Sequence, residues 1–163
     1  MSLNRYRPHV YVLPEDDANR QVANGFLLHL DLLARNIQVL PVARGWLKVL
    51  GQLETDYAPD LELYPQGFMV LLIDFDGHGG RLAEAQALIP PALRDRVFVI
   101  GALTEAERLK AQLGSYETIG RALAEDCRGN TNDTWGSELL RHNQPELERL
   151  RRCVLPILFS PTT

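Results

Sequence analysis

The sequence feature that most constrains the fold is a continuous apolar run over residues 68–73, which ends abruptly at Asp74. Apolar side chains on both faces of a strand require burial on both faces, which is typical of a central strand in a parallel sheet. Residues 10–13 and 96–100 show the same pattern, and residues 37–40 show a weaker version of it. Short continuous apolar runs of this length are typical of fully buried strands, so the sequence predicts a sheet of about four strands.

Between these strands, apolar residues recur at helical spacing. The most regular stripe consists of Val22, Phe26, Leu30 and Leu33. This alternation of strands and helices predicts an α/β fold with a mostly parallel central sheet flanked by helices. The pattern places helices over about residues 17–35, 46–53, 82–88 and 104–114.

The last third of the chain has a different pattern. Residues from about 104 to 152 read as successive helices, and residues 154–159 are apolar enough for a closing strand. Pro156 restricts that strand to an edge or an extended tail, because proline has no backbone N–H to donate. We expect one domain over residues 1–163, with an α/β core at 8–103 and a helical appendage at 104–163.

Composition narrows the class of protein. The chain has 163 residues, of which 45% are hydrophobic, and a formal net charge of -4. That charge argues against purely electrostatic binding to nucleic acid or to an anionic membrane. No stretch reaches the ~18 apolar residues of a membrane helix, and the N-terminus lacks a signal-peptide core. Cys127 and Cys153 have no metal-ligand spacing, so two free thiols in the reducing cytoplasm are expected.

An aspartate pair marks the end of the longest predicted strand. Asp74 and Asp76 are two positions apart, and side chains at that spacing on a strand point to the same face. Ligands bind at the carboxyl ends of strands in open α/β sheets. Two adjacent carboxylates repel each other, and a divalent cation held by oxygen ligands, Mg²⁺ or Mn²⁺, relieves the repulsion. The structural alternative is that both aspartates simply form the turn before Gly77.

A second group of acids follows the first predicted strand. Glu15 comes directly after residues 10–13 and Pro14, and Asp16 and Asp17 come next. If the first and third strands are neighbours, Glu15 lies at the same edge as Asp74 and Asp76, and the three carboxylates meet in one acidic cleft. The structural alternative is that Asp16 and Asp17 are the N-cap and a first-turn acid of the next helix. Both can hold, with Glu15 functional and the two aspartates structural.

This arrangement resembles the Toprim superfamily of topoisomerases, bacterial primases and overcoming-lysogenization-defect nucleases. Members have a Glu after the first strand and an Asp-x-Asp after a later central strand, as Glu15, Asp74 and Asp76 stand here, although the family usually has Gly where Asp16 stands. The resemblance covers about residues 8–103. It implies a Mg²⁺-dependent, nuclease-like activity on nucleic-acid phosphodiesters, with Glu15 as general acid/base and the two aspartates as metal ligands.

Two other classes of function stay open. Residues 71–77 are also similar to the first motif of haloacid-dehalogenase-type phosphatases, in which the first Asp, here Asp74, is the nucleophile. Lys110 would correspond to the third motif of that family. The family also has a late acidic pair on a strand, and the only candidates here are Glu125 and Asp126, which lie in a predicted helix. The remaining class is a non-catalytic interaction protein that kept the acidic site.

Two further features could assist phosphate chemistry. His78 follows the aspartates and could shuttle protons near neutral pH, although such a loop histidine is often merely solvated. Residues 141–152 carry a net charge of +2 and could contact nucleic-acid phosphates. The arginines concerned are Arg141, Arg149, Arg151 and Arg152. A solvated helix with paired charges is the structural alternative.

Overall fold

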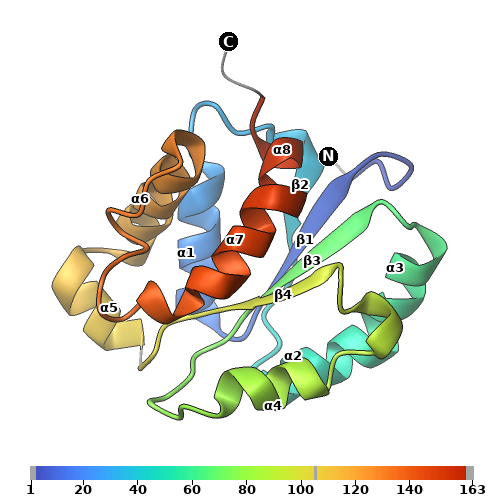
Figure 1. Cartoon of the computed structure of the whole chain (residues 1–163), viewed down its shortest axis with the longest axis horizontal. Coiled ribbons are helices and arrows are strands. Elements are labelled where there is room, and N and C mark those ends of the chain that lie inside the picture. The colour runs from blue at the N-terminus through green and yellow to red at the C-terminus, as the bar shows by residue number, and fades with distance from the viewer. Residues whose placement is uncertain (1–2, 105, 161–163) are drawn as a thin grey trace.

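A parallel β-sheet forms the centre of the protein. The computed structural model describes residues 3–104 and 106–160, and within them four strands pair in the order β2-β1-β3-β4 (Figure 1). The strands are β1 (His9–Pro14), β2 (Ile37–Val39), β3 (Gly67–Leu72) and β4 (Val97–Ile100). The predicted α/β fold with a parallel central sheet is confirmed.

The two central strands are β1 and β3, as the apolar runs predict. They pair in parallel over six positions, from His9 opposite Gly67 to Pro14 opposite Leu72. Every residue of β1 is buried, because alternate side chains of the strand face opposite layers of helices. Two apolar clusters result, one on each face of the sheet.

Helices from the start and the last third of the chain cover the first face (Figure 1). They are α1 (Asp17–Leu27), α5 (Ala106–Leu113), α6 (Tyr116–Gly129), α7 (Gln144–Cys153) and α8 (Leu155–Leu158). The helical last third of the chain therefore packs on the sheet together with the first helix. Its buried residues belong to the same apolar cluster as those of β1 and α1.

The second face is covered by α2 (Trp46–Gln52), α3 (Ala58–Leu63) and α4 (Arg81–Ala87). A π-helical turn at Leu53–Tyr57 joins α2 to α3. Short 3₁₀ helices lie at Ala34–Asn36, Pro91–Leu93 and Arg141–Asn143. In the part of the chain that the structure describes, no helix combines the length and apolar character needed to cross a membrane.

Helices α1 and α6 pack with their backbones in contact, and two glycines make this possible. A Cβ atom at Gly25 would lie 2.1 Å from the carbonyl oxygen of Glu117, and one at Gly120 would lie 1.9 Å from that of Val22. Real Cβ atoms do not approach this closely, so both positions require glycine. The close packing holds the second half of α1 against the first half of α6.

Two predicted elements differ from the structure. The helix predicted over residues 17–35 ends at Leu27, and Leu30, part of its apolar stripe, is 97% exposed. The closing strand predicted within residues 154–159 is wrong, because Leu155–Leu158 forms α8. Proline is tolerated in the first turn of a helix, where no N–H is needed, and a single antiparallel bridge joins Phe159 to Leu32.

Candidate metal centre

The acidic residues lie at the point where the strand order of the sheet reverses. From β1 the chain crosses to β2 on one side of the sheet, whereas β3 and β4 lie on the other side. Helix α1 leaves β1 toward the first face, and α4 follows β3 on the second face. Ligands of open α/β sheets bind at such a switch point, outside the carboxyl ends of the strands. Glu15, Asp16 and Asp74 are at this position.

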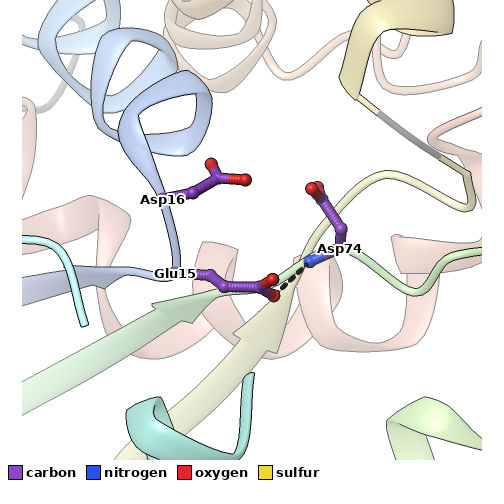
Figure 2. Close-up of side chains that lie close together, drawn as sticks. All are labelled: Glu15, Asp16 and Asp74. Atoms are coloured by element: carbon purple, nitrogen blue, oxygen red, sulfur yellow. Dashed lines mark hydrogen bonds between the residues drawn. The ribbon is translucent and has the colours of Figure 1, made fainter. Parts of the chain in front are cut away.

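Three carboxylates converge there (Figure 2). One oxygen each from Glu15, Asp16 and Asp74 lie within 4.8 Å of one another. Mg²⁺ binds oxygen at ~2.1 Å, so two ligands on opposite sides of one ion are ~4.2 Å apart. The three oxygens are therefore close to the spacing that a single cation requires. This group of three residues is called the acidic cluster below.

Hydrogen bonds to the backbone hold two members of the acidic cluster. Oε1 of Glu15 accepts from the amide of Asp74 at 3.0 Å, as the dashed line in Figure 2 shows. Oδ1 of Asp16 accepts from the amide of Asn19 at 3.0 Å, so Asp16 is the N-cap of α1. The N-cap prediction for Asp16 is confirmed. Its membership in the acidic cluster was missed, although its position directly after Glu15 at the start of a helix was a usable signal.

Asp74 is the most buried member of the acidic cluster. Its side chain has 6% exposure, and Oδ1 makes no hydrogen bond with any residue that the structure describes. Burial, followed by the negative charges of Asp16 and Glu15, raises the pKa of Asp74 to about 7. Burial also raises the pKa of Glu15 above its ordinary value. Negative charge is therefore disfavoured at this edge, and a divalent cation would favour the ionised carboxylates.

Asp76 does not belong to the acidic cluster. Strand β3 ends at Leu72, so the same-face rule for strands no longer applies at residues 74–76. Asp76 and Gly77 have φ angles of 51° and 70°, and this left-handed turn leaves the Asp76 side chain exposed. Its carboxylate lies 3.5 Å from Nη1 of Arg81. Asp76 still contributes to the raised pKa values of Glu15 and Asp74.

Arg81, the first residue of α4, is a basic group that the sequence did not single out. Its Nη1 donates to the carbonyl oxygen of Asp74 at 3.2 Å. The guanidinium lies over the ring of Trp46, 4.4 Å from the ring centroid. Arg81 lowers the pKa of Glu15, opposing the larger effect of burial. A fixed cation therefore lies beside the three carboxylates.

The other residues predicted to assist chemistry make different contacts. His78 is exposed, and its Nδ1 accepts from the amide of Gly80 at 3.2 Å. Its Nε2 lies 3.6 Å from Glu84. The structure thus pairs His78 with its own loop and helix rather than with the acidic cluster.

Two of the four arginines proposed to contact phosphate interact within the protein. Arg149 pairs with the buried Glu146 and donates to the carbonyl oxygen of Arg94 at 2.7 Å. Arg151 donates to the carbonyl oxygen of Thr131. Arg141 and Arg152 are exposed.

The residues proposed for the phosphatase alternative also lie in other surroundings. Asp126 is buried on α6, where its carboxylate accepts hydrogen bonds from residues 131–135. Glu125 pairs with His29 on the surface. The ammonium group of Lys110 lies over the ring of Tyr116, 5.3 Å from its centroid. Helix α6 holds the acidic pair, whereas the phosphatase motif requires it on a strand.

Comparison with known proteins adds no relative from which function could be transferred. No protein-family model, no curated protein and no solved structure matches this chain. Function is therefore inferred from the acidic cluster and its position in the sheet.

Proposed function

We propose that this protein is a Mg²⁺-dependent domain that acts on nucleic-acid phosphodiesters, with Glu15, Asp16 and Asp74 as the ligands of the cation. The observation that carries the proposal is the convergence of the three carboxylates within 4.8 Å at the switch point of the sheet. Mn²⁺ would occupy the same oxygen ligands. The class of substrate comes from the Toprim resemblance, and the cytoplasm is the location that the sequence leads us to expect.

Oδ1 of Asp74 is buried and makes no hydrogen bond with any described residue, which supports the fit of a cation. A carboxylate so placed is stabilised by a positive charge, and an all-oxygen set of ligands suits Mg²⁺. A bound Mg²⁺ would supply positive charge that stabilises the negative charge developing on a phosphate. The proposed ligands differ from the sequence-based set, since Asp16 takes the place of Asp76.

Proton transfer falls to Glu15 in this proposal. Its pKa is raised by burial, and a carboxyl whose pKa moves toward the working pH exchanges protons more effectively. As a water molecule attacks the phosphorus and the bond to the leaving oxygen breaks, the carboxyl of Glu15 would donate its proton to that oxygen and regain one from the attacking water. Arg81, held over Trp46 and beside Asp74, would contact a phosphate oxygen. The roles of Asp76 and His78 stay sequence-based predictions.

Metal binding is tested by thermal unfolding with and without Mg²⁺ or Mn²⁺. A ligand that binds only the native state stabilises it by about 2.7 kcal/mol at a hundredfold excess over Kd. We expect the melting temperature of the wild type to rise, and Asp74→Asn and Asp16→Asn to abolish the rise. Asn is as good an N-cap as Asp, so Asp16→Asn keeps α1 capped.

Asp17→Asn is the matched control for this experiment. Asp17 is adjacent to Asp16, but its carboxylate binds Arg20 and Gln21, so the metal-induced rise should persist in this variant. Equal rises in all of these proteins would mean that the ion binds elsewhere, and the assignment of ligands would then be wrong.

Activity is tested by Mn²⁺-dependent nicking of plasmid and cleavage of single-stranded DNA. Removing a general acid/base costs 10²–10⁴-fold in rate, so Glu15→Gln should lose cleavage by about that factor. A generic phosphomonoester is assayed in parallel. Hydrolysis of the monoester that survives Glu15→Gln would favour the phosphatase alternative. Metal binding without cleavage of either substrate would favour the third class, a non-catalytic interaction protein that kept the acidic site.

A further inference from the structure

The loop between β2 and α2 is bonded to the segment that carries Glu15. The amide of Arg44 donates to the carbonyl oxygen of Glu15, with 2.7 Å between nitrogen and oxygen. One position earlier, the amide of Ala43 donates to the carbonyl oxygen of Pro14 at 3.0 Å. These two bonds follow the last paired residues of β1 and β2. The backbone of Arg44 is therefore held beside a proposed ligand of the cation.

Arg44 has a backbone conformation that arginine rarely adopts. Its φ angle is 72°, in the left-handed region, which is unfavourable for residues other than glycine, asparagine and aspartate. A glycine or an asparagine at this position would relieve the strain. Strained backbone of this kind is concentrated at binding and catalytic sites, so the arginine side chain is the feature that needs a reason.

Packing within the protein does not supply that reason. The Arg44 side chain is exposed, and its guanidinium makes no hydrogen bond or ion pair with any of residues 3–104 and 106–160. Arg81, in contrast, is held by the carbonyl oxygen of Asp74 and by the ring of Trp46. Arg44 precedes Trp46 by two positions, and α2 and α4 both cover the second face. Two arginines thus border the acidic cluster on the same side, and the one at position 44 is free to bind a ligand.

We propose that Arg44 binds the substrate, through a phosphate next to the one that the cation and Arg81 contact. This inference rests on the proposed function and deepens it, because a contact with a second phosphate selects a polynucleotide strand over a mononucleotide. A guanidinium suits this role, since it is always charged and its planar fork of donors matches phosphate oxygens. Contacts to phosphate position the strand and carry no base specificity.

Fluorescence anisotropy with a short labelled oligothymidylate, at several salt concentrations, is the primary experiment. Ca²⁺ replaces Mg²⁺, since it also binds carboxylate oxygens, and the series is repeated in EDTA. Each phosphate contact on a single strand contributes about 0.7 to the slope of log K against log salt. Arg44→Asn should therefore reduce the steepness of that slope by about 0.7. At low salt it should weaken binding about tenfold, the effect of one lost charged hydrogen bond.

Two further variants separate a phosphate contact from a general effect of charge. Arg35 is exposed and precedes β2, whereas Arg44 follows it, so Arg35→Asn removes the same charge far from the acidic cluster and should leave the slope unchanged. Arg44→Lys keeps the charge but loses the planar fork, so it should keep the slope and bind more weakly than the wild type.

Thermal unfolding gives a second readout that needs neither metal nor DNA. Asparagine tolerates the left-handed conformation at position 44 better than arginine does. Arg44→Asn should therefore melt at or above the melting temperature of the wild type, although it binds the oligonucleotide more weakly.

Several results would overturn the proposal. An unchanged slope in Arg44→Asn, or equal changes in Arg44→Asn and Arg35→Asn, would mean that Arg44 contacts no phosphate, while the proposed function would stand. A lower melting temperature of Arg44→Asn would show that the arginine serves the fold. A wild type that binds no oligonucleotide in Ca²⁺ or in EDTA would overturn both this inference and the proposed class of substrate, and the metal-induced rise in melting temperature would still decide the metal centre separately.

Discussion

The carboxylate of Glu15 accepts a hydrogen bond from the backbone amide of Asp74, with 3.0 Å between Oε1 and N. This bond joins the segment after β1 to the segment after β3, 59 positions later in the chain. Glu15 therefore both contributes an oxygen to the acidic cluster and fixes the backbone of its most buried member. A substitution at Glu15 changes the charge of the site, its geometry, or both.

Substitutions at Glu15 should separate these two contributions. Glu15→Gln keeps an oxygen that can accept from Asp74 but removes a negative charge beside Asp16 and Asp74. Without metal, we expect it to raise the free energy of unfolding by about 1 kcal/mol, the size of one screened charge repulsion at this distance. Glu15→Ala also loses the hydrogen bond, and should be about 1 kcal/mol less stable than Glu15→Gln. Denaturant titration in EDTA measures both, and a Gln variant less stable than the Ala variant would contradict the argument.

Asp74 should make stability depend on pH. Its pKa is raised from 3.8 to about 7 by burial and by Asp16 and Glu15. Between these two pH values the folded protein keeps a proton that the unfolded chain has released, so the contribution of Asp74 to stability is present at low pH. It is lost as the pH rises, with a slope of up to ~1.4 kcal/mol per pH unit, and it levels off above about pH 7.

Asp74→Asn is the control for this pH dependence, because an amide does not titrate. Urea denaturation in EDTA at several pH values should show a steeper fall for the wild type than for the variant between about pH 4 and pH 7. If the free energy of unfolding depends on pH in the same way for both proteins, the pKa of Asp74 is not raised in the folded protein.

The crossing of α1 and α6 should tolerate no side chain at its two glycines. A Cβ atom at Gly25 or Gly120 would lie 2.1 Å or 1.9 Å from a backbone oxygen of the other helix. We expect Gly25→Ala and Gly120→Ala each to cost about 3 kcal/mol of stability. Gly51→Ala is the matched control in α2, since nothing lies within 4 Å of its added Cβ, and it should stabilise by about 1 kcal/mol. Thermal denaturation of the three variants tests the difference in sign.

Asp126 should be important for stability, although it lies outside the acidic cluster. Its buried carboxylate accepts from Thr131 Oγ1 and from the amides of Asp133, Thr134 and Trp135, at 2.7–3.2 Å. Asp126→Ala leaves these donors without their acceptor, and we expect a loss of about 2–4 kcal/mol. Glu125→Ala, one position earlier, removes only an exposed pairing and should cost less than ~1 kcal/mol. Similar losses in both variants would contradict this assignment.

The arrangement of the sheet could be predicted because its signal is local. The apolar run that ends at Asp74 requires burial on both faces, and β3 indeed lies between β1 and β4. The parallel pairing of β1 with β3 brings Glu15 and Asp74 to one edge. Apolar periodicity and the geometry of parallel strands were sufficient for these features.

The features that sequence reasoning missed depend on where elements end and on contacts distant in sequence. Asp76 is exposed, because β3 stops at Leu72 and the backbone enters a left-handed turn. Leu30 extends the apolar stripe of α1 but is exposed, so periodicity overestimates the length of the helix. The packing of α6, α7 and α8 on the first face joins residues distant in sequence, which no local pattern reveals.

The contact between α1 and α6 also constrains the order of folding. Gly25 leaves the ribosome long before its partner Glu117, so α1 has no helix to pack against while most of the chain is synthesised. Packing between such distant segments carries a large loop-closure cost and slows folding. The first face of the sheet, which α1 covers, can therefore be completed only after the C-terminal helices emerge. Until then its apolar surface is exposed, and the nascent chain is at its most prone to aggregation.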